Sequence, residues 1–229
     1  MPVEPPPTRW VFPPTEGADE FGVVGVGADL EPGTLLAAYR RGVFPMPIDE
    51  GHVVGWWSPD PRGVLELADL RVTRSLRQAC RRYRCTANSD FAKVITLCAE
   101  LPRDGSWITP SIVAAYTKLH ELGWAHSIEV WDDTDELVGG LYGVGIGKLF
   151  AGESMFHVAR DASKVALVEL VDRLRRAEVD LLDVQWCTDH LKTLGVREMA
   201  RADFLERVHT ATAPDAEAQR DAIGREMSR

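Results

Sequence analysis

The sequence predicts a mixed α/β fold built around a largely antiparallel sheet. Residues 137–156 are apolar apart from a glycine-rich centre and a short polar end, a pattern typical of a strand, a tight turn and a second strand. Residues 161–178 then carry apolar side chains at helical spacing, and another apolar run follows at residues 181–186. Because strands joined through a helix pair in parallel, one parallel crossover is expected in this sheet.

The bulk composition is typical of a globular protein, with 45% hydrophobic and 27% charged residues. The net charge of -9 opposes binding of polyanions by the molecule as a whole, so a nucleic-acid role requires a local basic patch. No apolar run approaches the ~20 residues of a membrane span, and the N-terminus MPVEPPPTRW lacks the features of a signal peptide. The expected location is therefore the cytoplasm, without a membrane partner.

The cysteines and histidines do not predict a metal site. The four cysteines form no CxxC pair, so reduced thiols are expected. No HExxH motif is formed by the dispersed histidines His120, His126, His157 and His190. A serine nucleophile is not expected either, because the sequence has no G-x-S-x-G elbow.

A small N-terminal domain is expected over residues 1–65. Residues 1–20 hold six of the fourteen prolines, which predicts an extended segment. Proline removes a hydrogen-bond donor from a strand ladder, so proline-rich aromatic stretches predict loops. The remaining elements expected in this domain are a strand at 21–26, a helix at 32–41, and loops at 44–47 and 56–62.

A larger domain is expected over residues 66–212, and the polar tail at 213–229 is expected to fray. Gly143, Gly145 and Gly147 predict a hairpin turn rather than a phosphate loop, because they lead into a strand and not into a helix. The other expected elements are a strand at 64–67, helices at 73–83, 90–101 and 110–122, a strand at 126–131, and a helix at 203–210.

An arginine cluster stands out against the acidic background. The helix predicted at 73–83 and its flanks carry six arginines and no acidic residue. Two interpretations remain open: a solvated helix face, or a phosphate-backbone site, because the guanidinium fork matches phosphate geometry. The six residues are Arg71, Arg74, Arg77, Arg81, Arg82 and Arg84.

Two carboxylates lie at the ends of apolar strands, where burial without partners would cost several kcal/mol. These are Glu153 and Asp183, and Gln185 lies two residues further on, on the same face of an extended strand. We expect the two strand ends to meet and form the active site, where a carboxylate and an amide can orient an amine nucleophile. The alternative from spacing alone is a structural hydrogen-bond network.

Short motifs spread over most of the chain form a specific combination, although none is specific alone. They are YRRGVFP (39–45), WWSPDPR (56–62), SWITP (106–110), HSIEVW (126–131), LVGGLYG (137–143), GESMF (152–156), ASK (162–164), LDVQ (182–185), and HL with LG (190–195). In this combination the sequence resembles the leucyl/phenylalanyl-tRNA–protein transferases. Two positions depart from the family pattern, since Met46 stands where the family usually has Trp, and Val184 where it usually has Cys.

The resemblance implies a C-terminal domain of the N-acetyltransferase-like (GNAT) fold behind the small N-terminal domain. It implies transfer of Leu or Phe, and less readily Met, from aminoacyl-tRNA to proteins with N-terminal Arg or Lys, which marks them for degradation by the N-degron pathway. No metal, nucleotide or coenzyme A is implied. Matching positions place the aminoacyl pocket and the site of the tRNA 3′ end at Trp107, Leu141, Ser154, Met155, Leu167, Leu170 and Leu182.

Within that reaction Asp183 is the expected base, directly or through Gln185, and Glu153 is expected to hold the donor. The arginine cluster is expected to bind tRNA phosphates. Two alternatives stay open: an acetyl-CoA-dependent N-acetyltransferase on the same fold, and a non-catalytic tRNA-binding module. The first is disfavoured because residues 152–154 lack the glycine pattern of a pyrophosphate loop.

Overall fold

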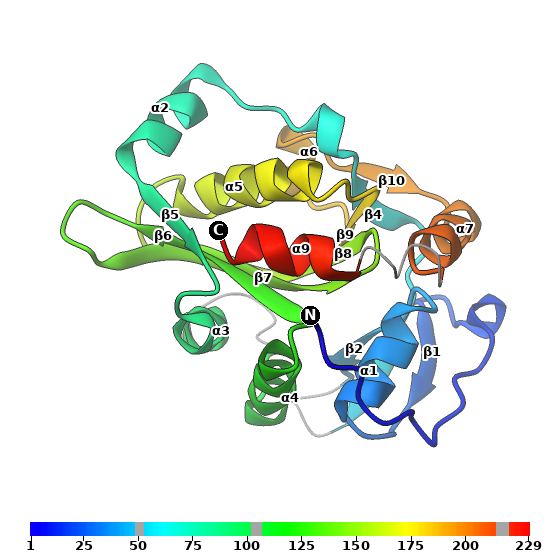
Figure 1. Cartoon of the computed structure of the whole chain (residues 1–229). Helices are drawn as coiled ribbons and strands as arrows, with labels where there is room; N and C mark the ends of the chain where they lie inside the picture. Colours follow the sequence, from blue (N-terminus) through cyan, green and yellow to red (C-terminus); the bar gives the residue numbers. More distant parts are fainter. Residues whose placement is uncertain (49–52, 102–106, 214–219) are drawn as a thin grey trace.

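The computed structural model describes residues 1–48, 53–101, 107–213 and 220–229, which form a three-stranded and a seven-stranded sheet (Figure 1). The small sheet belongs to the N-terminal part of the chain, and helices cover the large sheet on both faces. The predicted mixed α/β class is confirmed. None of the helices in the described ranges combines the length and the apolar character that crossing a bilayer requires.

The N-terminal domain contains an antiparallel sheet in the order β1-β3-β2, with helix α1 beside it. Its elements are the 3-10 turn η1 (Thr15–Gly17), β1 (Val23–Val26), α1 (Pro32–Tyr39), β2 (Phe44–Pro47) and β3 (Val54–Trp57). The predicted loops at 44–47 and at both ends of 56–62 are therefore wrong, since residue 62 begins a strand of the large sheet. Strand β2 lies at the edge of the sheet. Pro45 and Pro47 lack a backbone N–H, which an edge strand tolerates because it pairs on one side only.

The large sheet runs in the order β10-β4-β9-β8-β7-β6-β5. Its strands are β4 (Arg62–Leu65), β5 (Arg84–Ala87), β6 (Ala125–Trp131), β7 (Leu137–Ile146), β8 (Leu149–His157), β9 (Leu181–Gln185) and β10 (Arg197–Met199). All neighbours pair antiparallel except β8 and β9, which run parallel. Helix α5 (Ala162–Arg176) joins these two strands, so the predicted parallel crossover is confirmed.

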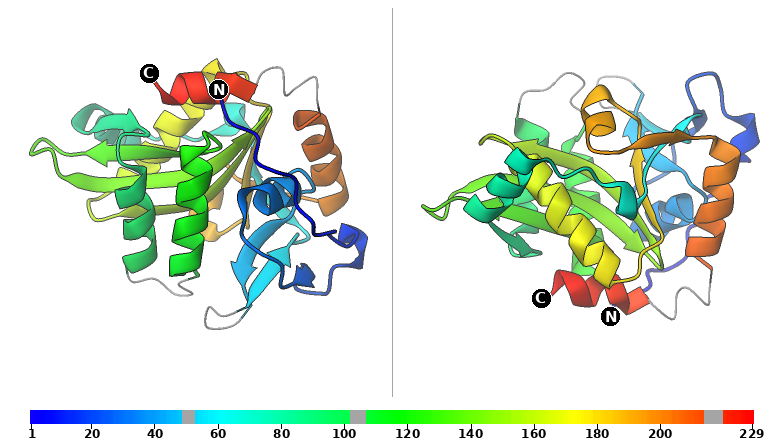
Figure 2. Two further views of the ribbon diagram at one scale, coloured as in Figure 1. Left: turned by 60° about the horizontal axis from the view of Figure 1, so that its bottom comes forward. Right: turned by 90° about the horizontal axis from the view of Figure 1, so that it is seen from above.

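Helices on the two faces of the large sheet bury its apolar side chains (Figures 1 and 2). Helix α5 lies on one face together with α2 and α9, and α3 and α4 lie on the other. These helices are α2 (Arg74–Arg82), α3 (Phe91–Glu100), α4 (Pro110–Glu121) and α9 (Arg220–Met227). Three further elements belong to the domain: the 3-10 turn η2 (Leu67–Asp69), α6 (Asp189–Thr193) and α7 (Arg201–Ala211).

The predicted hairpin of β7 and β8 is present, but its glycines have different structural roles. The turn itself is at Gly147 and Lys148, where Gly147 has a φ of 58°. Gly143 lies inside β7, and a Cβ added there would be 2.3 Å from the carbonyl oxygen of Ala151. Gly143 is therefore required by the close approach of β8 rather than by a turn.

Two expectations about boundaries need correction. The domain division expected after residue 65 would place β4 in the N-terminal domain, but β4 pairs with β9 and β10 in the large sheet. The tail expected to fray contains helix α9, in which Ile223 and Met227 are only 2% and 1% exposed and belong to the core cluster of α5. Two apolar side chains four residues apart are a weak sequence signal, yet they are enough to hold one face of a short helix.

One hydrophobic core joins the N-terminal domain to the large sheet. Leu35 and Leu36 of α1 are completely buried in the same cluster as Tyr116 of α4 and Tyr142 of β7. Helix α1 contacts α4, and the N-terminal segment adds a hydrogen bond from the Val3 amide to the carbonyl of Leu122, at 2.8 Å. This shared packing fixes α1 against α4 and the large sheet.

Candidate active site

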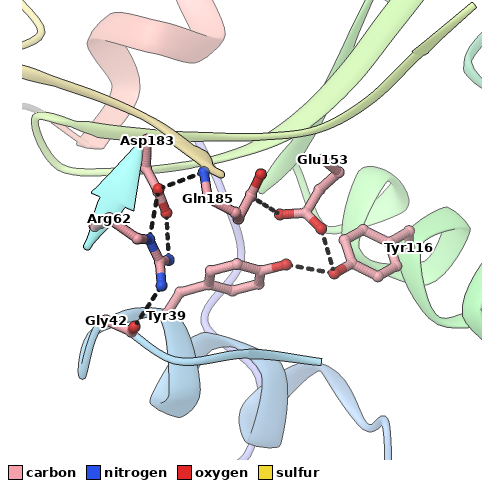
Figure 3. Close-up of polar contacts among 7 residues, drawn as sticks. All are labelled: Tyr39, Gly42, Arg62, Tyr116, Glu153, Asp183 and Gln185. Carbon is pink, nitrogen blue, oxygen red and sulfur yellow. Dashed lines mark hydrogen bonds and ion pairs between the residues drawn. The ribbon is translucent and has the colours of Figure 1, made fainter. Parts of the chain in front are cut away.

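The ends of β8 and β9 meet, as the sequence predicts. The two strands are parallel neighbours in which Ala151 pairs with Asp183. Beyond this pair, the side-chain amide of Gln185 donates to Oε1 of Glu153 at 3.3 Å (Figure 3). The structure thus brings together all three residues expected to be catalytic, Glu153, Asp183 and Gln185.

Local irregularities in β8 and β9 orient the side chains of Glu153 and Gln185. The register of β8 against β7 shifts between Gly152 and Ser154, so Glu153 is the extra residue of a bulge. The register of β9 against β4 shifts between Asp183 and Gln185, and Gln185 adopts a φ of 60°. Such left-handed backbone is strained for a residue other than glycine and is common at functional sites.

Asp183 makes a two-point ion pair with Arg62 of β4. Nε of Arg62 donates to Oδ1 at 2.8 Å and Nη2 donates to Oδ2 at 2.6 Å, and the two side chains are 1% and 2% exposed. The backbone amide of Gln185 also donates to Oδ1, at 3.0 Å. Both carboxylate oxygens of Asp183 are therefore occupied by hydrogen bonds within the protein.

The guanidinium of Arg62 is itself held from three sides. It lies 4.7 Å from the ring centroid of Phe44 and 4.4 Å from that of Phe204, and Nη1 donates to the carbonyl of Gly42 at 3.3 Å. Sequence reasoning missed Arg62. The sequence signal for it is an arginine at the end of the aromatic motif WWSPDPR, whose prolines predict a loop.

This geometry argues against Asp183 as the base that the sequence predicts. A general base must reach the proton that it removes, and Asp183 is buried with its oxygens directed at Arg62 and Gln185. The arrangement instead fixes Gln185, because its backbone amide bonds to Asp183 while its side chain reaches Glu153.

Glu153 is the carboxyl with the altered proton affinity. Desolvation by the surrounding protein raises the pKa of Glu153 from its ordinary value of 4.5 to about 8, although part of the side chain is exposed to the cavities described below. The hydroxyls of Tyr39 and Tyr116 oppose this rise, as does the charge of Arg62, while the charge of Asp183 adds to it. The hydroxyl of Tyr116 donates to Oε2 of Glu153 at 3.0 Å.

A cavity of about 270 Å³ opens beside Glu153 and Gln185. Strands β7, β8 and β9, helices α5 and α6, and the segment before α4 form its walls, and most of the side chains that line it are apolar. All seven residues that the sequence assigns to the aminoacyl pocket line it: Trp107, Leu141, Ser154, Met155, Leu167, Leu170 and Leu182. Sequence reasoning did not anticipate Tyr142, Thr188 and Leu191, which also line it.

A second cavity of about 150 Å³ adjoins the first and shares Glu153, Gln185 and Trp107 with it. Its other walls include the rings of Phe44 and Trp186, whose centroids are 5.1 Å apart. The two departures from the family pattern, Met46 and Val184, both line this cavity. Two concave spaces thus converge on one carboxyl and one amide, as a reaction between two bound molecules requires.

The arginine cluster is exposed, and none of its six residues lines either cavity. Helix α2 lies at the periphery of the molecule, on the side away from the N-terminal domain, with Leu76 buried against its neighbours (Figure 1). Arg84 belongs to β5 rather than to the helix and pairs with Asp135 at 2.7 Å. The exposed side chains of the cluster are Arg71, Arg74, Arg77, Arg81, Arg82 and Arg84.

Ser106, the first residue of the SWITP motif, lies outside the described residues. Trp107 is the first described residue after that gap and lines both cavities. Thr109 then caps α4 by accepting a hydrogen bond from the amide of Ile112, at 3.4 Å, as expected for a threonine before a first-turn proline. The motif therefore positions one wall of the cavities and begins the helix that carries Tyr116.

Comparison with known families gives matches to two models. Residues 64–209 match the model described as leucyl/phenylalanyl-tRNA protein transferase, and residues 28–60 match that of its N-terminal domain. Similar proteins carrying the name leucyl/phenylalanyl-tRNA--protein transferase occur in several bacteria. That of Anaeromyxobacter dehalogenans (strain 2CP-C) is 50% identical over 216 residues, which cover 92% of each chain. That of Shewanella denitrificans is 48% identical over 192 residues, covering 83% of this chain and 82% of the relative.

Solved structures resemble the chain only weakly. A functionally unknown conserved protein from Staphylococcus epidermidis has a TM-score of 0.42 at 10% identity, over 61% of this chain and 57% of its own. A tandem GNAT protein from the clavulanic acid biosynthesis pathway has a TM-score of 0.38 at 16% identity, over 82% of this chain and 59% of its own. Likeness at this level carries no argument about the site.

Proposed function

Because the chain belongs to the leucyl/phenylalanyl-tRNA–protein transferase family, we propose that its two adjoining cavities bring a charged tRNA 3′ end and a protein N-terminus together at Glu153 and Gln185. The chain is an aminoacyltransferase that uses aminoacyl-tRNA as its donor. The family assignment selects this reaction over acetyl transfer and over tRNA binding without catalysis. Marking of the acceptor for degradation by the N-degron pathway is consistent with the family.

The first cavity is the proposed site of the donor's amino-acid side chain. Leu167 and Leu170 of α5 and Leu182 of β9 form apolar walls that suit Leu, Phe and Met. A misfit of one methylene in such a pocket changes discrimination by about 1–3 kcal/mol. Branching at Cβ would place a methyl group close to the reacting carbonyl, so Val and Ile are expected to be poor donors. Trp107, at the junction of the two cavities, supports the tRNA 3′ end in this proposal.

The second cavity is the proposed site of the acceptor's N-terminal residue. An N-terminal Arg or Lys carries a cation, and aromatic faces such as those of Phe44 and Trp186 attract cations. Trp186 is 39% exposed, so this cavity can be entered from solvent. Glu153 at the inner end is the acidic group that an amine or guanidinium would meet there.

We assign the proton transfer to Glu153. The α-amine nitrogen attacks the ester carbonyl carbon, and its proton passes to the Glu153 carboxylate as the N–C bond forms. Breaking of the ester C–O bond releases the tRNA 3′ oxygen, which takes the proton back from Glu153. A carboxyl with a pKa of about 8 can both accept and return a proton near neutral pH. Gln185 orients Glu153, and Asp183 with Arg62 holds Gln185 in place.

The exposed arginines of α2 and its flanks are the proposed contact with the tRNA backbone. Aminoacyl-tRNA is a polyanion, and the molecule as a whole carries a net charge of -9. Binding therefore needs a local concentration of cations, which this cluster supplies without an acidic residue between Arg71 and Arg84. A donor of this kind is available in the cytoplasm, so we place the protein there.

The observation that carries the proposal is the cavity that collects seven predicted side chains beside Glu153 and Gln185. Its test is a mass-spectrometric assay with Phe-tRNA and a peptide that begins with Arg. The expected product is the peptide extended by Phe, and a peptide that begins with Glu serves as the matched control. Equal labelling of both peptides, or labelling from acetyl-CoA instead of Phe-tRNA, would contradict the proposal.

A further inference from the structure

We propose that Tyr39 and Tyr116 are positioning residues, forming a chain of two hydroxyls that donates into Glu153 and holds its carboxylate ready to accept the proton. The inference rests on the function proposed above, because it concerns how Glu153 performs that role. It also makes the N-terminal domain part of the catalytic machinery, since Tyr39 belongs to α1 and Tyr116 to α4.

The chain of contacts is continuous and enclosed (Figure 3). The hydroxyl of Tyr39 hydrogen-bonds the hydroxyl of Tyr116, which in turn donates to Oε2 of Glu153 at 3.0 Å. Tyr39 is 2% exposed and Tyr116 is completely buried. The other oxygen of Glu153 faces Gln185, so each carboxylate oxygen has a separate hydrogen-bond partner.

Counting protons gives the direction of the chain. A tyrosine hydroxyl has one hydrogen, and Tyr116 directs its hydrogen to Glu153. Tyr39 must then donate its own hydrogen to Tyr116. Both hydroxyl dipoles therefore point toward the ionised carboxylate. The hydrogen bond from Tyr39 to Tyr116 strengthens the one from Tyr116 to Glu153, because aligned hydrogen bonds polarise one another.

The charges around Glu153 explain why such a chain is useful. Burial and the negative charge of Asp183 on β9 both disfavour the ionised carboxylate, whereas Arg62 on β4 favours it. The tyrosines favour it from the opposite side, on α1 and α4, and Gln185 contributes a neutral amide. Burial raises the pKa of both tyrosines well above 10, so they remain neutral donors in the working pH range.

Packing alone does not require the hydroxyls. The two rings lie in the core that joins the domains, where Phe would fill the same space. Removing one hydroxyl should therefore keep the fold, but it should raise the pKa of Glu153 by removing donation to its ionised form. Below that pKa the ionised fraction falls about tenfold for each unit of the rise.

The test measures single-turnover transfer from saturating Phe-tRNA to one Arg-initiated peptide across pH, for wild type, Tyr116→Phe and Tyr39→Phe. We expect the acid limb of the rate profile to move to higher pH in both variants, with tRNA affinity unchanged. Tyr83→Phe is the matched control, because Tyr83 is also buried but donates to the carbonyl of Arg160, at 3.2 Å. The acid limb of the Tyr83→Phe rate profile should stay at the wild-type pH.

A second measurement uses 3-fluorotyrosine at position 116, which preserves the ring and makes the hydroxyl a stronger donor. The acid limb should then move to lower pH. The proposal is wrong, and the tyrosine chain is structural only, under one set of results. In that case the wild type transfers Phe and Glu153→Gln abolishes transfer, but the acid limb stays at its wild-type pH in folded Tyr39→Phe, in folded Tyr116→Phe and in the fluorinated protein. Wild type without transfer would instead remove the proposed function itself, and an active Glu153→Gln would remove the role of Glu153.

Discussion

Arg62 and Asp183 form a buried two-point ion pair that joins β4 to β9 beside the candidate active site. Both side chains are at most 2% exposed, and the aromatic rings of Phe44 and Phe204 lie over the guanidinium. The pair links elements 121 residues apart in the sequence and includes one ring from the N-terminal domain. Its loss should therefore affect both the fold and the site.

The first prediction concerns stability. Arg62→Ala leaves a buried carboxylate without its cation, so the free energy of unfolding should fall by about 3–5 kcal/mol. Urea denaturation at pH 7 measures it. Asp135→Ala is the matched control, since its pair with Arg84 is exposed at 81% and 54% and should contribute less than about 1 kcal/mol. Equal losses in the two variants would contradict the assignment of Arg62 as a structural anchor.

The second prediction separates the roles of the two carboxylates. If Glu153 moves the proton and Asp183 only orients Gln185, Glu153→Gln should reduce kcat by about 10²–10⁴ without destabilising the protein. Asp183→Asn should lose stability as well as activity, because it weakens the pair with Arg62. Single-turnover rates and urea denaturation, measured on the same preparations, test this. If Asp183→Asn is as stable as wild type but its transfer rate no longer depends on pH, Asp183 would be the base after all.

The sequence was sufficient for the elements with long periodic patterns. Helix α5 and the strands on either side of it follow from apolar spacing, and the parallel pair follows from their order. The seven residues expected to line the aminoacyl pocket follow from positions that match the family, and the sheet and α5 bring them to one cavity.

The parts that sequence reasoning missed are those set by long-range geometry. Arg62 follows a proline, which locally predicts a loop, and nothing in the neighbouring sequence shows that Asp183 will lie opposite it. Tyr39 and Tyr116 fit the apolar faces of their helices, so only the fold reveals that their hydroxyls meet. The bulge at Glu153 has no distinct local pattern, since it arises from the packing of β8 against β7.

The third prediction concerns the arginine cluster. Arg77→Ala combined with Arg81→Ala should weaken tRNA binding and reduce the slope of log affinity against log salt by roughly one to two units, if each contacts a phosphate. Filter binding at several salt concentrations measures both quantities. Arg9→Ala with Lys118→Ala removes the same charge from the N-terminal segment and from α4, outside the arginine cluster, and should leave the slope unchanged. Equal effects of the two double variants would indicate only a general charge effect.

The fourth prediction concerns the size of the donor pocket. Leu170 of α5 lines the cavity of about 270 Å³ and is 1% exposed, so Leu170→Ala should enlarge the space for the donor side chain. We expect transfer of Trp to rise relative to Leu, with some loss of stability from the cavity. Competition between differently charged tRNAs measures the ratio. Leu174→Ala, on the same helix but outside this cavity, is the control, and equal ratios in the two variants would contradict the assignment.

The fifth prediction follows from the raised pKa of Glu153. Folding lifts that pKa from 4.5 to about 8, so the folded state holds the proton more tightly than the unfolded state does. The resulting stabilisation is complete below pH 4.5 and is lost as pH rises to about 8. Glu153→Gln has no such proton to lose. Its stability relative to wild type should therefore increase from pH 5 to pH 8.5.

Urea denaturation at pH 5, 6.5 and 8.5 measures this difference, with Glu16→Gln, at an exposed position, as the control. The pH-dependent gain should appear in Glu153→Gln and be absent from Glu16→Gln, because only Glu153 is desolvated beside the charge of Asp183. In the Tyr116→Phe background the gain from Glu153→Gln should be larger. The ionised Glu153 carboxylate there lacks the hydrogen bond from Tyr116, so its pKa is raised further. A stability difference between Glu153→Gln and wild type that stays constant across pH would mean that Glu153 titrates normally, and the proton transfer would then need another acceptor.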